Sequence, residues 1–99
     1  MTADRTSATA GDRLRRAEGV WSNPVQDRAV LYSWNDGKAI VLNPAGAALW
    51  EALESPRTAD DLAELLIRRF PGLSTERARA DVAAFLDRLL SESVIQPGP

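Results

Sequence analysis

The sequence of 99 residues contains no cysteine and no histidine. Without cysteine the chain has no thiolate nucleophile, no disulfide framework and no thiolate ligand for zinc or an iron–sulfur cluster. Without histidine it lacks the commonest general base and the commonest transition-metal ligand of proteins. Sites built from carboxylates alone remain possible, so these absences narrow enzymatic chemistry without excluding it. We expect no metal ion and no other cofactor.

The sequence also lacks a large excess of either charge and has no long apolar run. Twelve lysine and arginine residues stand against 14 aspartate and glutamate residues, which gives a net charge of −2. A nucleic-acid partner usually requires a basic face, so this balance disfavours one. The N-terminus has no apolar run of the signal-peptide kind, and no segment reaches the roughly 18 apolar residues of a membrane span. We therefore expect a soluble cytoplasmic protein with no membrane partner.

Length and composition indicate one small globular domain. With 44% hydrophobic residues the chain has the composition of a folded protein, and 99 residues can bury a modest core. Residues 1–12 are small, polar and without pattern, which predicts an N-terminal tail. Residues 97–99 read Pro-Gly-Pro and predict a C-terminal tail. The folded domain is therefore expected over residues 13–96.

The first half of the domain has the composition of strands. Residues 28–34 are rich in branched and aromatic side chains, and Asn35-Asp36-Gly37 follows as a turn signal. Residues 38–42 are again apolar, so the two runs predict a β-hairpin. Upstream, residues 14–21 are expected to supply another strand, which ends at Ser22-Asn23-Pro24.

The second half has helical periodicity and clear helix boundaries. Asn43 before Pro44 places an N-cap residue ahead of a proline at the first helical position. Pro56 ends that helix. Thr58 opens the next one, with Asp61 three residues later in the spacing of a capping box.

A third helix is predicted after Pro71-Gly72, with Ser74 or Thr75 as its cap. Val94 and Ile95 are expected to add a short extended piece after it. The order of three strands followed by three helices predicts an α+β domain, similar to a winged helix-turn-helix with a three-stranded antiparallel sheet. The apolar stripe of the third helix is formed by Ala78, Val82, Phe85, Leu86, Leu89 and Leu90.

Candidate catalytic groups are few. Asp60 and Asp61 form the only adjacent carboxylate pair, and both fall in the first turn of a helix, where acidic residues favour the helix dipole. Asp81 follows Arg77 by four residues, which is the spacing of a solvated ion pair on a helix surface. The glycines show no pattern that would cradle a phosphate.

A winged-helix architecture raises the possibility of DNA binding, with the third helix as the reading element. From residue 74 to residue 92 this helix carries three arginines against four carboxylates, a net charge of −1. Such a helix would meet repulsion from phosphates instead of releasing counterions. This charge disfavours a winged-helix DNA-binding regulator, which is the alternative function that the fold class suggests.

The edges of the predicted sheet differ in their protection. The first strand carries Arg13, Arg15, Arg16 and Glu18, the kind of charge that protects an edge from further pairing. The third strand, residues 39–42, is apolar and has a lysine only at its start. Such an edge is covered by the protein's own helices, is an aggregation hazard, or is a docking site for an extended peptide.

Three segments together resemble the PqqD-like family. The run from Val41 to Leu53 resembles its strand-to-helix junction, with a leucine–asparagine pair, a small-residue helix start and an apolar–tryptophan pair. Thr58 with the leucines that follow it resembles the second helix of the family. The run from Ala80 to Leu90 resembles the third, with its Asp-Val and Phe-Leu pairs. The resemblance spans about residues 14–96; Ser93 departs from it, where the family more often has glycine.

The resemblance implies a function. PqqD-like domains are recognition elements for ribosomally made, post-translationally modified peptides. They bind the leader of a precursor peptide as an extra strand, between the third strand and the third helix, and present it to modifying enzymes. These partners include radical SAM enzymes and, for lasso peptides, a leader peptidase and a macrocyclase. The role needs no catalytic side chain, so the resemblance implies that the chain is not an enzyme.

Two sets of contact residues follow from the resemblance, one on the strand and one on the helix. Val82 and Leu86 of the helix set have an alternative interpretation as core residues. Arg79 could pair with an acidic leader residue or remain solvated. Leu49 and Trp50 are expected to pack in the core. The strand set is Ala39, Ile40, Val41 and Leu42, and the helix set is Arg79, Val82, Ala83 and Leu86.

Overall fold

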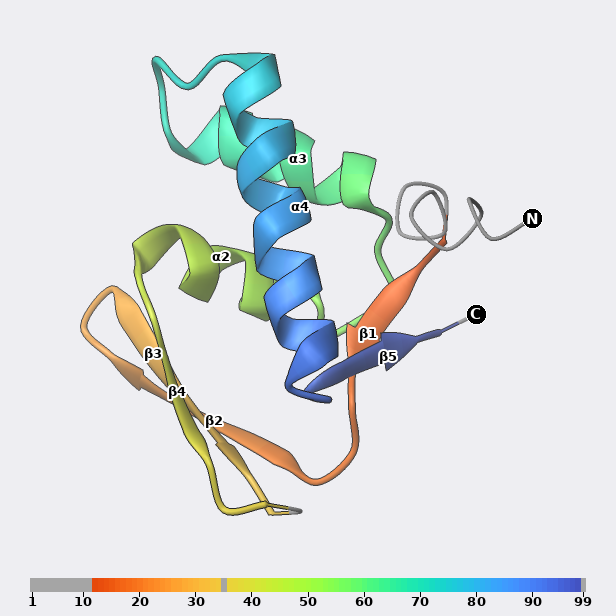
Figure 1. The fold of residues 1–99 in the computed structure, drawn as a ribbon. Helices are drawn as coiled ribbons and strands as arrows, with labels where there is room; N and C mark the ends of the chain where they lie inside the picture. Colours follow the sequence, from red (N-terminus) through yellow and green to blue (C-terminus); the bar gives the residue numbers. More distant parts are fainter. Residues whose placement is uncertain (1–11, 35, 99) are drawn as a thin grey trace.

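A computed structural model describes residues 12–34 and 36–98. It contains a three-stranded antiparallel sheet in the order β2-β3-β4, a two-stranded sheet of β1 and β5, and three helices. Figure 1 shows the helices gathered on one side of the three-stranded sheet, with α2 next to β3 and β4 and α4 beyond it. The elements are β1 (Leu14–Arg16), β2 (Val20–Val25), β3 (Arg28–Ser33), β4 (Ala39–Leu42), α2 (Pro44–Ala52), α3 (Ala59–Arg69), α4 (Thr75–Ser91) and β5 (Ile95–Pro97).

The predicted α+β class and the antiparallel meander are confirmed. β3 is the central strand, with β2 on one side and β4 on the other. The turn between β3 and β4 places Gly37 at a φ of 69°, a conformation that glycine adopts without strain. Asp36 supports the turn, because its Oδ1 accepts a hydrogen bond from the Lys38 N–H at 3.2 Å. Asn35, the first residue of the predicted turn signal, lies outside the described residues.

The predicted strand over residues 14–21 is wrong. It is two strands, since the chain turns at Gly19 (φ 81°) and β1 and β2 belong to different sheets. The break expected at residues 22–24 instead lies inside β2. Pro24 is tolerated there because β2 is an outer strand: the Trp34 N–H bonds to the Gly19 carbonyl, and the alternation of the ladder turns position 24 away from β3.

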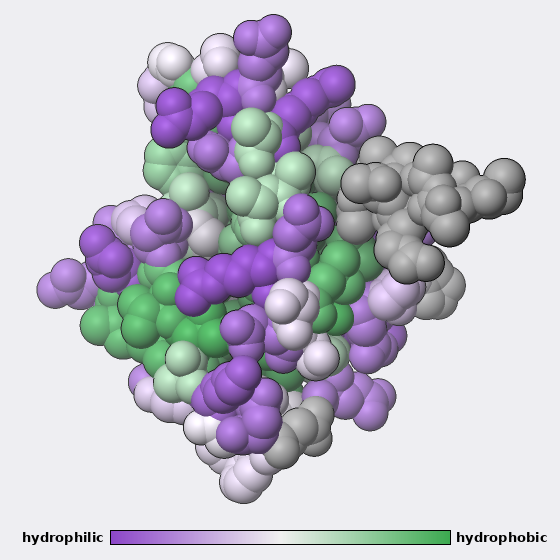
Figure 2. Space-filling view, viewed as in Figure 1, coloured by the Kyte–Doolittle hydropathy of each residue, from purple (hydrophilic) through white to green (hydrophobic). Residues whose placement is uncertain are grey.

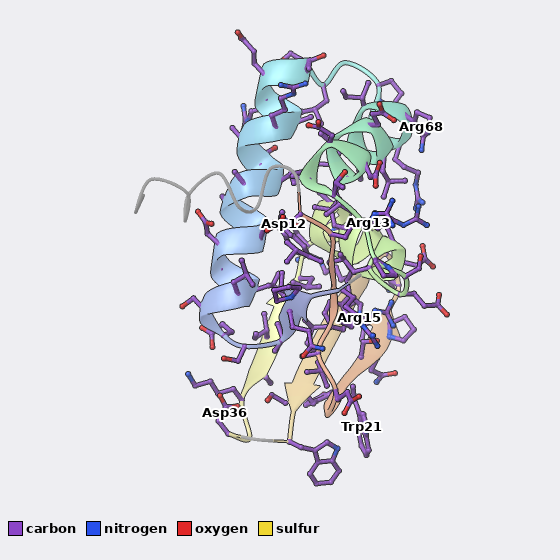
Figure 3. The ribbon with its side chains drawn as sticks, turned by 90° about the vertical axis from the view of Figure 1, so that its right-hand side faces the viewer. Asp12, Arg13, Arg15, Trp21, Asp36 and Arg68 are labelled. Carbon is purple, nitrogen blue, oxygen red and sulfur yellow. The ribbon has the colours of Figure 1, made fainter. Side chains whose placement is uncertain are left out.

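The charged residues expected to protect an edge of the three-stranded sheet do not lie on it. They precede β2, and Figure 3 shows Arg13 and Arg15 along β1 instead. Arg16 holds β1 to the end of α2: its Nε and Nη2 donate to the Trp50 carbonyl at 3.0 and 2.8 Å. Its guanidinium also lies 4.7 Å from the centre of the Trp50 ring, a cation–π contact. Burial lowers the pKa of Arg16 below its ordinary value.

Each helix begins with the side-chain cap that the sequence predicts. The Asn43 Oδ1 accepts from the Gly46 N–H at 2.8 Å, with Pro44 in the first helical turn of α2. Thr58 and Asp61 form a reciprocal capping box at the start of α3. Ser74 is the cap of α4, which decides between the two candidate residues. These caps fix where the helices start, and so where α4 stands relative to the sheet.

The capping box predicts a pH dependence of stability. The backbone N–H of Thr58 donates to Asp61 and holds the pKa of this carboxyl below its ordinary value of 3.8. A depressed pKa contributes stability above the unfolded-state pKa and loses it as pH falls through the folded-state pKa. We expect the gap in unfolding free energy between the wild type and Asp61→Asn to shrink below about pH 4. Urea titrations at several pH values measure this gap; a gap that grows on acidification would contradict the assignment.

The C-terminal strand extends further than predicted. Val94 and Ile95 are buried, and β5 runs to Pro97, opposite Leu14 of β1. The Gly98 N–H then donates to the Arg13 carbonyl at 2.9 Å. Pro97 and Gly98 are therefore paired backbone, whereas a tail was expected over residues 97–99. Pro99 lies outside the described residues.

A single apolar core joins the sheet to the helices. It includes Trp50 (3% exposed) and Leu49 (2% exposed), which confirms their predicted role in packing. No helix within the described residues is both long and apolar enough to cross a membrane. The largest fully buried side chains are Leu31, Leu49, Leu53, Leu62, Leu66, Val82, Leu86, Leu89 and Val94.

Candidate functional site

The hydrogen-bond pattern of the β3–β4 hairpin decides which groups of β4 are free. The Ser33 N–H donates to the Lys38 carbonyl at 3.1 Å, so these two residues form a hydrogen-bonded pair. Hydrogen-bonded and non-bonded pairs alternate along an antiparallel ladder. Ile40 and Leu42 are therefore the next residues whose backbone groups face β3, in the register in which β3 and β4 are paired.

The backbone N–H and C=O groups of Ala39 and Val41 consequently point away from β3. Among the described residues no further strand pairs with β4, so this edge of the sheet is open. The side chains alternate as well, because Ile40 and Leu42 are buried while Val41 is 58% exposed. The edge therefore offers backbone hydrogen-bond donors and acceptors to an incoming strand. The side chains of Ile40 and Leu42 point inward and pack in the core.

A groove of about 460 Å³ lies between this edge and α4. Val41 and Leu42 form its strand side, and the start of α2 and the core leucines Leu49 and Leu66 close its floor. Figure 2 shows hydrophobic residues gathered on this side of the molecule, where β4 and α2 lie in Figure 1. The α4 side of the groove is formed by Arg77, Asp81, Ala84, Phe85 and Arg88.

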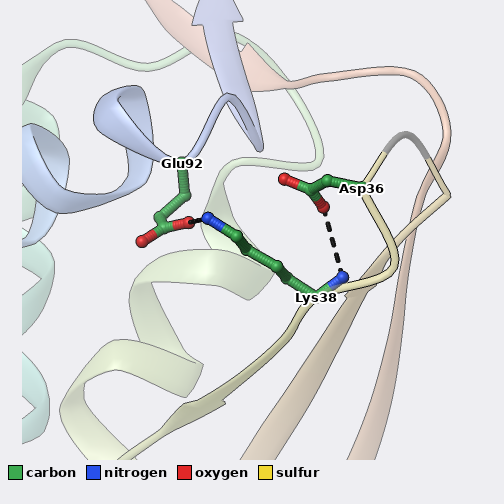
Figure 4. A network of polar contacts seen from close by, with 3 residues as sticks. All are labelled: Asp36, Lys38 and Glu92. Carbon is green, nitrogen blue, oxygen red and sulfur yellow. Dashed lines mark hydrogen bonds and ion pairs between the residues drawn. The ribbon is translucent and has the colours of Figure 1, made fainter.

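Two contacts show that β4 and α4 run in opposite directions along the groove. At one end the Lys38 Nζ lies 3.4 Å from the Glu92 Oε1 and bridges the start of β4 to the end of α4 (Figure 4). Further along, a Cβ built on Gly46 would lie 3.4 Å from both the Leu42 Cβ and the Phe85 Cε1. Leu42 and Phe85 therefore lie on either side of Gly46, and Leu42 is level with Phe85.

None of the four helix residues predicted to contact the leader lines the groove. Val82 and Leu86 are 1% and 0% exposed and belong to the core, the alternative that the sequence left open. Arg79 is exposed and points toward α3, where its Nη2 lies 4.0 Å from the Asp60 Oδ1. Ala83 is exposed but does not line the groove.

The residues that do line the groove from α4 repeat with the same helical period, but on the neighbouring flank of the helix. Phe85 is the one member of the predicted apolar stripe among them, and it is only partly buried. Arg77 and Asp81 were expected to be a solvated ion pair, and they are paired at 3.4 Å on the exposed surface. Only the position of β4 identifies this flank as the groove wall. The sequence carries no local signal for it, because tertiary packing decides where β4 lies relative to α4.

A second exposed apolar feature lies on the face of the sheet that turns away from the helices. Trp21 and Trp34 pack edge to face with ring centres 5.0 Å apart, and both are more than half exposed. Tyr32, opposite Trp21 in the sheet, is 45% exposed beside them. Figure 3 shows Trp21 at the far end of the sheet from the helices. This cluster is separate from the groove, whose lining it does not share.

The carboxylates of the described residues are dispersed and do not gather into a metal site. Within residues 12–34 and 36–98, no three aspartate or glutamate side chains lie together as metal ligands. Asp60 and Asp61, the adjacent carboxylates, serve the start of α3 and a contact with α4.

Comparisons with known proteins agree with this architecture. A family model described as coenzyme PQQ synthesis protein D (PqqD) matches residues 28–95. The fold is similar to TbiB1 in complex with the TbiA(beta) leader peptide, with a TM-score of 0.76 and 18% identity over 83% of this chain and 94% of that one.

A second solved structure is the PqqD truncation of Methylobacterium extorquens PqqCD, described as a functional and stand-alone recognition element for ribosomally synthesized and post-translationally modified peptides. Its TM-score is 0.71, with 19% identity over 91% of this chain and 98% of that one. No curated protein matches the sequence. At these identities the likeness to the solved structures shows a shared fold.

Proposed function

The chain belongs to the PqqD family, and we propose that it binds the leader segment of a ribosomally made precursor peptide and presents that peptide to a modifying enzyme. The observation that carries this proposal is the open edge of β4 above a groove. The solved structure of TbiB1 with a leader peptide, which shares the fold, supports it.

Binding would proceed by strand addition. An extended leader segment beside β4 would exchange main-chain hydrogen bonds with Ala39 and Val41, whose backbone groups face the open edge. Alternate leader side chains would then enter the groove and meet Leu42 and Phe85. Ile40 would support the strand from the core side, because its side chain is buried.

The domain would assist modification of the precursor peptide by raising its effective concentration near the enzyme. This role requires no reacting group of this chain. A leader held on the domain keeps the attached core peptide close to the enzyme, so that later encounters become intramolecular. We propose a cytoplasmic setting, where precursor peptides are translated. The enzyme partner is proposed to be either a radical SAM enzyme or the peptidase and cyclase of a lasso-peptide pathway.

The proposal is tested by titrating isotope-labelled protein with a synthetic leader from a short open reading frame encoded beside its gene. We expect a dissociation constant in the micromolar range and backbone shifts confined to residues 39–42 and the groove side of α4. A scrambled leader and a DNA duplex serve as controls. If no neighbouring leader bound and the duplex did, the winged-helix regulator would replace this proposal.

A further inference from the structure

The charge of the groove is opposite in sign to that of the whole protein. The chain carries a net charge of −2, yet the groove is lined by three arginines and one carboxylate. The arginines come from two elements, Arg28 from the start of β3 and Arg77 and Arg88 from α4. An excess of positive charge over an apolar floor attracts an anionic ligand that also has apolar side chains.

Two of these guanidinium groups are available to such a ligand. The Arg77 Nε is 3.4 Å from the Asp81 Oδ1, so the single groove carboxylate already has a partner. Arg28 and Arg88 make no ion pair within the part of the chain that the structure describes. The attraction for an acidic side chain is therefore concentrated at these two positions, one on each side of the groove.

The alignment of β4 with α4 predicts how far apart an apolar and an acidic residue of the bound peptide would be. Leu42 is level with Phe85, and Arg88 lies about 4.5 Å further along the helix toward the Lys38–Glu92 bridge. In an added strand, side chains two positions apart lie on one face and are about 6.6 Å apart. If one such side chain packs on Phe85, the next one on the same face lies about 2 Å beyond the Cα level of Arg88, a gap that the long arginine side chain spans.

We propose that the groove selects an extended peptide in which an apolar residue and an acidic residue stand two positions apart, the first packing on Phe85 and the second pairing with Arg88. Arg28 adds to the attraction from the opposite side of the groove. The proposal deepens the leader-binding function proposed above and rests on it. It places the recognition of an acidic residue on a different flank of the helix from Arg79, for which the resemblance had left both pairing with an acidic residue and solvation open.

The test compares charge reversals on the two flanks of α4. The probe is the fluorescein-labelled synthetic leader from the neighbouring open reading frame. Arg88→Glu should weaken its binding about fivefold, because an attraction becomes a repulsion. Arg79→Glu changes the net charge equally but lies outside the groove, so it should change affinity less than twofold. The wild-type affinity should fall with added salt, and more steeply than that of Arg88→Glu.

A second set of probes replaces each acidic residue of that leader with lysine in turn. One replacement, two positions from an apolar residue, should bind wild type poorly and regain affinity on Arg88→Glu. Equal effects of the two arginine reversals, or a leader that binds well without any acidic residue, would overturn the selection while leaving leader binding intact. Failure of every neighbouring leader to bind would instead refute the underlying function.

Discussion

Replacing Val41 with proline should weaken leader binding about tenfold or more while the domain stays folded. The N–H of residue 41 faces the open edge of β4 and takes no part in the pairing with β3. Proline removes this donor and puts a ring where an incoming strand would lie. One lost hydrogen bond accounts for up to about 1.5 kcal/mol, close to a factor of ten, and the steric effect of the ring adds to it.

The matched control is Val41→Thr, which keeps the N–H and the branched shape of the side chain. It should bind the leader within about threefold of wild type. Circular dichroism and urea unfolding first establish that both variants are folded, and fluorescence titration then compares their affinities. A folded proline variant with unchanged affinity would move the binding site off this edge of the sheet.

Leu86→Ala should lower the free energy of unfolding by about 3 to 5 kcal/mol. Leu86 is 0% exposed at the centre of the core, so the truncation leaves a cavity that the surrounding side chains fill only in part. A domain of this size has a stability of about 5 to 15 kcal/mol, so the variant should be close to its unfolding transition at moderate temperature. Urea denaturation of the wild type and the variant measures the difference.

Phe85, the neighbour of Leu86, allows the effect of a groove residue to be compared with that of a core residue. Phe85 is only partly buried and lines the groove, so Phe85→Ala should lose leader affinity and less stability than Leu86→Ala. Arg79→Ala, on the exposed flank of α4, should change stability by less than about 0.5 kcal/mol. A Leu86→Ala protein of wild-type stability but poor leader binding would show that this residue faces the ligand.

Local chemistry accounts for the elements that the sequence predicted correctly. Asn43, Thr58 and Ser74 each cap a helix through a hydrogen bond to a residue three positions later, an interaction contained in one turn. The hairpin of β3 and β4 likewise depends on neighbouring residues and a turn containing Gly37. Such contacts leave a readable pattern because their partners are close in sequence.

The pairing of β1 with β5 left no such pattern. Leu14 lies opposite Pro97, so the two strands come from opposite ends of the described chain and their pairing is a long-range contact. A three-residue strand also has too few positions to show an alternation of apolar and polar residues. The same lack of local signal explains why the charges of Arg13 and Arg15 were assigned to the wrong sheet.

The sequence by itself determined that this protein is a small α+β domain without cysteine or histidine, with an apolar, unprotected strand at residues 39–42 and a family resemblance that names a function. Tertiary structure decided which flank of α4 faces that strand. Helical periodicity shows which residues share a face, but the direction of the face depends on what the helix packs against. Here α4 buries Val82 and Leu86 and turns Phe85 and Arg88 toward β4, and this orientation creates the groove.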